Sequence, residues 1–137
     1  YIETTPIQLL QMISKIATGS NFIPSIINDK YNFIIHNDLK IKHRHLAMLR
    51  RSMMQISCKK RNYAKELLIA GKTGTSQIIS TKHNTHSYLY KDHSLFVGYI
   101  PYNKPEFAIS TVIENGGWGS KVALPISQKI LLDLKKL

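Results

Sequence analysis

Lys72, Thr73, Gly74 and Thr75 are the residues best suited to chemistry, and they follow one another in a segment typical of a β-strand. A strand with a free edge offers N–H and C=O groups to an extended peptide, which adds as a further strand. Gly74 has no Cβ, so a ligand backbone can approach it closely. The Lys72 ammonium and the hydroxyls of Thr73 and Thr75 can bind a carboxylate, and a backbone N–H near Thr75 can stabilise an oxyanion. These residues predict a peptide-binding strand; the alternative is an ordinary strand with exposed polar side chains.

This strand needs neighbours to hold it, and the sequence predicts two. The β-rich runs Ser94–Ile100 and Glu106–Glu114 are joined at residues 101–105 by a hairpin-type connection with a proline at each end. The binding strand itself is expected over residues 72–79, and the polar segment 80–92 is expected to form a loop. Because the hairpin brings its strands together in opposite directions, we expect an antiparallel sheet.

The first helix is signalled at both ends. Thr5 can cap it, Pro6 suits its first position, and Gln8 completes a capping box of the T-x-x-Q kind. Gly19 is a natural left-handed stop. The apolar residues Ile7, Leu10, Ile13 and Ala17 recur on one face, which we expect to be buried.

Two further helices complete the predicted fold. Asn37 or Asp38 can cap the second, which is expected to reach about Ser57, after a short strand at 31–36. The third is expected to open at Pro125, after a tight glycine loop at residues 115–120. The expected apolar stripes of these two helices are Leu46, Leu49, Met53 and Ile56, then Ile126, Ile130, Leu131, Leu134 and Leu137. The predicted order of elements is two helices, three strands and a last helix that can cover the sheet. This order indicates an α+β fold.

Composition narrows the function classes. The chain has 137 residues, enough for one domain, and 43% of them are hydrophobic, enough to bury a core. It carries a net charge of +11, which can attract nucleic acid, but fifteen of its nineteen basic residues are lysines spread along the chain. We therefore interpret the charge as composition bias and expect no nucleic-acid partner, with a basic nucleic-acid binder as a further alternative. The lone Cys58 excludes an internal disulfide and a paired-cysteine zinc site. His43 and His45 do not share a helix face, so we expect no metal site.

Four blocks, in order, resemble the C-terminal part of the transpeptidase domain of class B penicillin-binding proteins. The likeness is greatest to the elongation-specific peptidoglycan D,D-transpeptidases, known as penicillin-binding protein 2. β-Lactamases share the K-T-G motif but not the whole set. The blocks are Glu3–Leu9, Gly71–Gln77, His93–Pro101, and Glu114–Ser120 followed by Ala123 and Pro125.

This resemblance implies a penicillin-recognising fold, an antiparallel sheet flanked by helices, of which residues 1–137 form part of one transpeptidase domain. It implies acyl transfer through a serine ester, which cross-links peptidoglycan stem peptides at D-Ala-D-Ala and which β-lactams block by mimicry. Carried over by motif, Lys72, Thr73, Gly74 and Thr75 bind the substrate, and the Thr75 N–H forms part of the oxyanion hole. No metal or other cofactor is implied.

The implied partners are stem peptides, β-lactams and an upstream part of the same domain, with the cell-elongation machinery as a further candidate. The implied location is the periplasmic face of the bacterial inner membrane, although no run of about 18 apolar residues supplies an anchor in this chain. His93 begins a strand that should neighbour Lys72, so we expect it near the cleft. For Trp118, packing beneath the last helix is the expectation, and a ligand contact is the alternative.

The chain departs from the family at the nucleophile. Ser57 and Lys60 fit the S-x-x-K pattern, but Ser57 is expected at the C-terminal end of a helix, where the dipole disfavours an anion. No S-x-N triplet occurs in the sequence. We therefore expect a binding strand without an attacking group, inactive alone. A non-catalytic module of the same fold that binds a peptide or a protein partner is the alternative.

Overall fold

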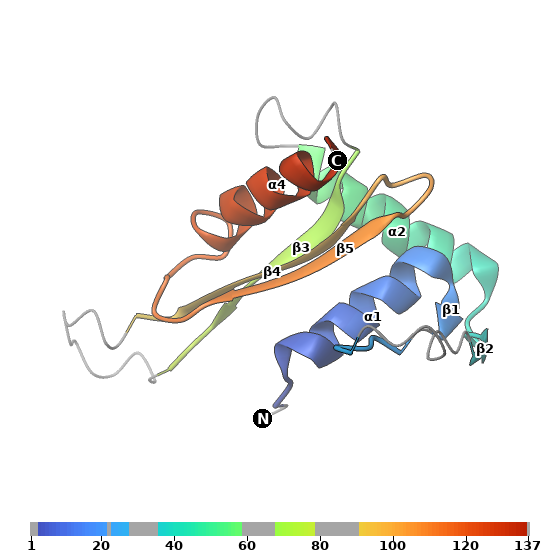
Figure 1. Ribbon diagram of the computed structural model, residues 1–137, viewed down its shortest axis with the longest axis horizontal. Coiled ribbons are helices and arrows are strands. Elements are labelled where there is room, and N and C mark those ends of the chain that lie inside the picture. The colour runs from blue at the N-terminus through green and yellow to red at the C-terminus, as the bar shows by residue number, and fades with distance from the viewer. Residues whose placement is uncertain (1–2, 22, 28–35, 59–67, 79–90, 137) are drawn as a thin grey trace.

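A computed structural model describes the chain over most of its length. At its centre is an antiparallel sheet of three strands, β3 (Ala70–Ser76), β4 (His93–Ile100) and β5 (Phe107–Ile113), in that spatial order. Helix α4 covers one face of the sheet, and α1 and α2 cover the other (Figure 1). This arrangement confirms the predicted α+β fold with an antiparallel sheet between helices. The residues that the structure describes are 3–21, 23–27, 36–58, 68–78 and 91–136.

The register of the sheet decides which side chains share a face. Thr73 lies opposite Phe96, which in turn lies opposite Thr111. Lys72 lies opposite Val97. Because directly opposed residues point to the same side and neighbours alternate, Thr73 is on the α4 face and Lys72 is on the face of α1 and α2.

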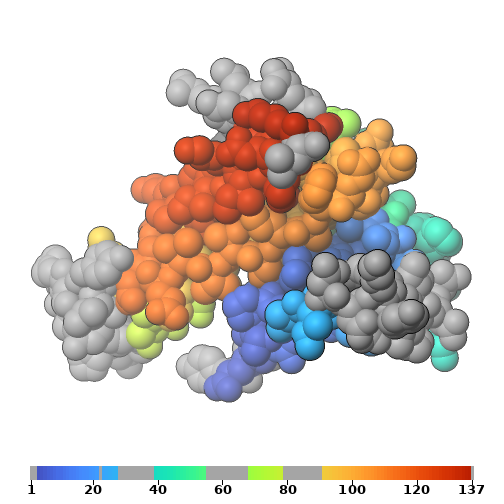
Figure 2. Space-filling view, viewed as in Figure 1, coloured from blue at the N-terminus to red at the C-terminus, as the bar shows by residue number. Residues whose placement is uncertain are grey.

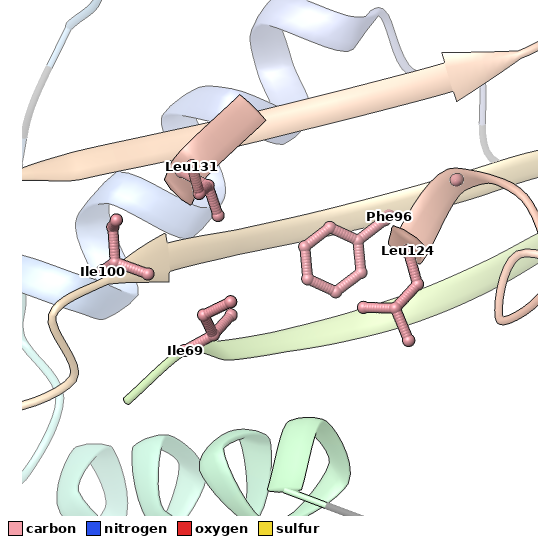
Figure 3. Close-up of a cluster of buried hydrophobic side chains, with 6 residues drawn as sticks. Ile69, Phe96, Ile100, Leu124 and Leu131 are labelled. Atoms are coloured by element: carbon pink, nitrogen blue, oxygen red, sulfur yellow. The ribbon is translucent and has the colours of Figure 1, made fainter. Parts of the chain in front are cut away.

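Two hydrophobic clusters hold these layers together. On the α4 face, Phe96 lies at the centre of a buried group (Figure 3). Its members are Ile69, Phe96, Ile100, Ala123, Leu124 and Leu131. On the opposite face, a second group joins the two N-terminal helices to the sheet, and its buried members are Ile13, Ala17, Met53, Ala70 and Tyr99. Burial of apolar area on both faces makes the sheet a rigid support for the exposed parts of its strands.

Helix α1 (Pro6–Thr18) follows its sequence signals closely. The Thr5 hydroxyl accepts a hydrogen bond from the N–H of Gln8 at 3.3 Å, and the Gln8 side chain accepts one from the N–H of Thr5 at 2.8 Å. Gly19 ends the helix with a φ of 79°. Ile13 and Ala17 are buried as expected, whereas Ile7, at the first turn, is 37% exposed.

Helix α2 (His43–Cys58) begins later than expected. Residues 37 and 38 do not cap it, because they belong to β2 (His36–Asp38), which pairs with β1 (Ser20–Asn21) after α1. Of the expected stripe, Leu46 and Met53 are buried, and Leu49 is 44% exposed. The side chain of Ile56 and the rest of the expected strand at 31–36 lie outside what the structure describes, as does most of the expected loop at 80–92.

Arg50 links the two N-terminal helices. Its guanidinium Nε donates a hydrogen bond of 2.6 Å to the carbonyl oxygen of Ile16 in the last turn of α1. A cation at that end of a helix also interacts favourably with the helix dipole. The side chain therefore joins α2 to α1.

Helix α4 (Ala123–Leu134) begins two residues before the expected Pro125, and its buried face also differs. Ile126 and Ile130 were expected to be buried but are 41% and 43% exposed. The face that packs on the sheet consists of Ala123, Leu124, Ser127, Gln128 and Leu131. The hydroxyl oxygen of Ser94 in β4 accepts the N–H of Ala123 at 2.9 Å and so caps the helix from the sheet.

Within the described residues, no helix has the length and apolar character that crossing a bilayer requires.

Candidate functional site

The predicted binding residues lie on β3, at the edge of the sheet. Among the described strands, β3 has a neighbour on one side only, which is β4. Lys72, Thr75 and Ser76 are exposed, and Thr73 and Gly74 are partly buried. The sequence-based prediction of an exposed β-strand at these residues is therefore confirmed, with the strand starting at Ala70 and ending at Ser76. Such an edge can accept an additional strand through its main chain.

The two kinds of side chain on this strand point to opposite faces. Thr73 and Thr75 are on the α4 side of the sheet, because they lie opposite Phe96 and Ser94. Lys72 is on the other side, and its ammonium donates a hydrogen bond of 2.7 Å to the carbonyl oxygen of Thr73. A ligand can meet the ammonium and both hydroxyls only if it lies along the edge of the strand, where the long Lys72 side chain can reach round.

Gly74 leaves space on the Lys72 side of this edge. A Cβ at Gly74 would meet only the Leu95 side chain within 4 Å, at 3.4 Å and 4.0 Å, which is ordinary van der Waals contact. The contacts within the described chain therefore do not by themselves require glycine at this position. The missing side chain keeps the strand backbone accessible, as expected of a strand that a ligand backbone approaches.

The segment that follows β5 is fixed against the C-terminal end of β3. Gly119 is buried there, and a Cβ on it would collide with the carbonyl oxygens of Gly74 and Leu95. Its N–H donates to the Thr75 hydroxyl over 3.4 Å, a long hydrogen bond. Thr75 still has its own O–H free to donate, so it can interact with Gly119 and with a ligand carboxylate at the same time.

Two further hydrogen bonds, both donated by main-chain N–H groups, hold this segment to the beginning of β4. The N–H of Gly117 donates to the carbonyl oxygen of Asp92 at 2.7 Å, and the N–H of Asn115 donates to Nδ1 of His93 at 3.0 Å. His93, which we expected near the cleft, therefore has a positioning role for the loop. Asn115 and Gly117 have φ values of 53° and 78°, which produce the tight turn.

Trp118 does not pack beneath the last helix, so that expectation is wrong. Its side chain is 68% exposed, and the ammonium of Lys121 lies 5.4 Å from the centre of the ring system. The backbone on its C-terminal side is pressed against the sheet at Gly119, and the indole projects outward. The space-filling view shows the end of β3, in yellow-green, beside the orange segment that follows β5, both at the surface (Figure 2).

Ser57 lies in the last turn of α2, as the sequence predicted. At this end of a helix the dipole opposes the formation of a nucleophilic alkoxide.

The structure places Tyr99 in the core and not in this site. It lies opposite Ala70, and its hydroxyl is buried without a hydrogen-bond partner among the described residues. Burial raises the pKa of Tyr99 to about 12, a rise that the nearby charge of Arg50 opposes and that Tyr102 reinforces. Its hydroxyl is thus neutral at physiological pH.

Sequence reasoning missed several residues that shape the site. Gly119 and Ser94 were given no role, although Gly119 packs against Gly74 and Thr75 and Ser94 lies opposite Thr75. A detectable signal was present in the three glycines around Trp118 at 116, 117 and 119, because glycine is used where two backbones approach closely.

Comparison with known proteins gives consistent results. Residues 2–132 match the family described as the penicillin binding protein transpeptidase domain. A peptidoglycan D,D-transpeptidase MrdA from Haemophilus influenzae is 38% identical over 69 residues, which is 46% of this chain and 11% of the relative. The MrdA protein of Acinetobacter baumannii is 42% identical over 77 residues, which is 50% of this chain and 12% of the relative.

Solved structures show the same likeness in three dimensions. The penicillin-binding protein PBP2 of Helicobacter pylori, solved in complex with MreC, matches 98% of this chain with a TM-score of 0.74 and 28% identity. PBP2 of Pseudomonas aeruginosa, in complex with WCK 5153, matches 93% of this chain with a TM-score of 0.67 and 29% identity. These matches cover 26% and 30% of the two solved chains.

Proposed function

The chain belongs to the penicillin-binding protein transpeptidase family, and we propose that it supplies the substrate-binding strand of a peptidoglycan D,D-transpeptidase of the PBP2 type. The chain spans about a tenth of the length of the curated relatives it matches and roughly a quarter of the solved PBP2 chains. The proposal therefore separates what these residues do from what the whole enzyme does.

The observation that supports the proposal most strongly is the exposed edge of β3. An extended stem peptide pairs with this edge through its main chain, so that its C-terminal carboxylate lies beside Lys72, Thr73 and Thr75. The ammonium and the two hydroxyls, which lie on opposite faces, hold the carboxylate from both sides of the strand. Charge-assisted hydrogen bonds of this kind are the strong ones in proteins.

The proposed chemical contribution is binding and charge stabilisation. With the carboxylate fixed, the carbonyl carbon of the preceding residue lies near the N–H of Thr75, which stabilises the negative charge that develops on the carbonyl oxygen during acyl transfer. The serine that attacks this carbon, and its base, are proposed to come from a part of the enzyme other than β3. A β-lactam occupies the same edge because its carboxylate and carbonyl match those of the peptide.

The proposal extends to partners and location. One of the similar solved structures is a complex of PBP2 with MreC, so we infer that the complete enzyme works with the cell-elongation machinery. Because it would cross-link peptidoglycan, we also infer that the complete enzyme works at the periplasmic face of the inner membrane.

A second candidate is a non-catalytic module of the same fold that only holds a peptide. Ser57, the one S-x-x-K serine in these 137 residues, lies at the end of α2, where it is badly placed for catalysis, so these residues by themselves fit either candidate. Both candidates bind a peptide at the β3 edge, but only the transpeptidase converts it to product.

Peptide binding tests what the two candidates share. An N-acetylated peptide ending in D-Ala-D-Ala is titrated into the chain and followed by isothermal calorimetry, beside the same peptide with a C-terminal amide. We expect the amide to bind about tenfold more weakly, because hydrogen bonds to charged groups are worth roughly 1.5–3 kcal/mol. Lys72→Ala should remove this preference, whereas Lys129→Ala, at an exposed lysine on α4, should keep it. Equal binding of both peptides by the unaltered chain would contradict the proposal.

Turnover then separates the candidates. A complete enzyme with this chain as its C-terminal part is expected to release D-alanine from the peptide, and a binding module is not.

A further inference from the structure

His93 lies where the start of β4 meets the segment after β5. Ser94 pairs with Ile113 in the register of these strands, so the start of β4 and the end of β5 lie side by side at one end of the sheet (Figure 1). The N–H of Asn115 donates to Nδ1 of His93 at 3.0 Å, and His93 is partly buried. The imidazole therefore accepts a main-chain N–H from a tight turn, in which Asn115 has a φ of 53°.

This hydrogen bond specifies the protonation state of His93. A neutral imidazole has one N–H and one acceptor nitrogen, whereas an imidazolium has an N–H on both nitrogens and no acceptor. Because Nδ1 accepts here, the ring is neutral and its proton is on Nε2. A second proton goes to Nδ1, where it faces the N–H of Asn115. Protonation of His93 thus removes the hydrogen bond and sets two donors against each other.

The segment that begins with Asn115 also supports the binding strand. Four residues further on, Gly119 packs on the carbonyl oxygen of Gly74, and its N–H donates to the Thr75 hydroxyl. The segment is therefore attached to β4 at one end and to β3 four residues later. A loss of the first attachment is transmitted to Thr75 over a short stretch of backbone.

The other described attachments of this segment to β4 do not respond to pH near neutrality. The N–H of Gly117 donates to the carbonyl oxygen of Asp92, and the N–H of Ala123 donates to the hydroxyl oxygen of Ser94. Carbonyl and hydroxyl oxygens accept in the same way at any pH from 5 to 8, and histidine is the side chain that ordinarily changes charge in this interval.

The charges around His93 are of both signs. Ser76, directly opposite on β3, is uncharged. Among the described residues, the charged groups on the segments that adjoin His93 are Lys91, Asp92, Glu114, Lys121 and, farther along the same face of β3, Lys72. An imidazolium here would attract the carboxylate of a bound peptide, because opposite charges attract. Weaker binding at low pH is therefore opposite in sign to the direct charge effect, and the lost hydrogen bond accounts for it.

Resting on the proposed function, we propose that His93 is a positioning residue that makes peptide binding at the β3 edge dependent on pH. With a neutral imidazole, the segment after β5 is held in place and Gly119 keeps Thr75 in position for the ligand. When His93 takes up a proton, the N–H of Asn115 loses its acceptor, the segment loosens, and the peptide binds more weakly.

The affinity for peptide at two pH values tests this inference. An N-acetylated peptide ending in D-Ala-D-Ala is titrated into the chain by calorimetry at pH 7.5 and at pH 5.5, and its carboxylate stays ionised at both values. We expect binding to be about threefold to tenfold weaker at pH 5.5, which is the effect typical of one hydrogen bond.

Three variants assign the effect to His93. The amide oxygen of asparagine is bonded to Cγ, as Nδ1 of histidine is, and it accepts at either pH. His93→Asn should therefore bind the peptide equally well at both pH values, about as tightly as the original chain at pH 7.5. His93→Ala should bind it equally weakly at both. His45→Asn, at an exposed histidine of α2, should keep the pH dependence of the original chain.

Nuclear magnetic resonance gives a second readout that needs no variant. The amide signal of Asn115 reports on its own hydrogen bond, and the amide signal of Gly119 reports on the contact with Thr75. Both signals should shift along the same titration curve as the ring signals of His93 when the pH falls from 7.5 to 5.5. An amide signal of Asn115 that stays constant while the His93 ring titrates would overturn the inference, whatever the variants do.

The outcomes also separate this inference from the proposed function. If the peptide binds in a Lys72-dependent way with equal affinity at both pH values, or if His93→Asn keeps the pH dependence, the inference is wrong and the proposed function stands. If the peptide does not bind at pH 7.5, or if Lys72→Ala has no effect there, the proposed function fails, and the control of peptide binding by His93 fails with it.

Discussion

The N–H of Gly119 and the hydroxyl of Thr75 are joined by a hydrogen bond across 44 residues of sequence. The bond is long, at 3.4 Å, but the backbone of Gly119 also rests on the carbonyl oxygens of Gly74 and Leu95. The segment after β5 is therefore packed against the end of β3 and hydrogen-bonded to it. A change in the segment should alter the position of Thr75, the residue whose N–H and hydroxyl are both proposed to contact the ligand.

Gly119→Ala is expected to lower both stability and peptide affinity. The new Cβ would collide with two backbone carbonyl oxygens, which cannot move away without shifting the strands. We expect a loss of about 2 kcal/mol or more in the free energy of unfolding, measured by chemical denaturation. Peptide binding should weaken in the same variant, because Thr75 loses its partner.

Gly117→Ala is the matched control for that variant. Gly117 has a φ of 78°, but a Cβ there would meet nothing within 4 Å. We expect only the strain of a left-handed alanine, about 1 kcal/mol, and nearly unchanged peptide affinity. Equal effects of the two substitutions would show that close packing at Gly119 is unimportant.

Ser94→Ala is expected to destabilise the chain through helix α4. The Ser94 hydroxyl accepts the buried N–H of Ala123, and Val122, at the cap position, supplies no side-chain hydrogen bond. Without this acceptor the free energy of unfolding should fall by about 1 to 2 kcal/mol. Ser52→Ala, at an exposed position of α2, is the control and should change the free energy of unfolding by less than about 0.5 kcal/mol. A similar loss in both variants would count against the cap.

The raised pKa of Tyr99 predicts that the chain loses stability at high pH. Its pKa is about 12 in the folded chain and 10.0 as the ordinary value. The contribution of Tyr99 to the free energy of unfolding is fully present below pH 10, because its hydroxyl is then neutral in both the folded and the unfolded chain. Between pH 10 and 12 the unfolded chain releases the proton while the folded chain retains it, so stability falls as pH rises, by as much as about 2 to 3 kcal/mol.

Tyr99→Phe isolates this contribution. The variant should be as stable as the original at pH 7 or slightly more stable, because the buried hydroxyl has no partner among the described residues. Its stability should fall less between pH 10 and 12, as followed by denaturation at each pH. Parallel curves for the two proteins would show that another group is responsible.

A fluorescent penicillin is expected not to label this chain covalently. Ser57, the serine that fits S-x-x-K, lies in the last turn of α2. Labelling is read on a denaturing gel, with a complete penicillin-binding protein as the positive control. A stoichiometric label that Ser57→Ala abolishes would overturn this prediction, and one that Ser57→Ala leaves in place would identify another nucleophile.

Much of the fold could be predicted from local signals. The ends of α1 were marked by Thr5 and Gly19, which act through their own neighbours in sequence. The start of α2 was not predictable in this way, because residues 37 and 38 belong to β2, which pairs with β1, and do not cap the helix. The competing partner is distant in sequence, so composition could not reveal it.

The buried face of α4 shows a second limit of pattern reading. The stripe that packs on the sheet has a regular helical spacing, but two of its members, Ser127 and Gln128, are polar. The Ser127 hydroxyl oxygen lies 2.7 Å from both the Thr111 hydroxyl and the carbonyl oxygen of Ala123, so its burial is satisfied. A search for hydrophobic residues therefore selected Ile126 and Ile130, which are exposed.

For the candidate site, the sequence predicted the strand and its residues but not their division between two faces. That division could have been predicted, because side chains alternate along a strand and Lys72 is an odd number of residues from Thr73 and from Thr75. The contact of Gly119 with Gly74 and Thr75 depended on how the segment after β5 folds back onto the end of β3. That information is tertiary and becomes visible only in the structure.

The anchoring of residues 115–123 by main-chain N–H groups has an evolutionary consequence. Amide hydrogens are the same whatever the side chain, so the outward positions 118 and 121 are free to diverge without loosening the scaffold. Both positions are therefore expected to accept other side chains while β3 stays intact. A laboratory library directed at these two positions should yield mostly folded variants.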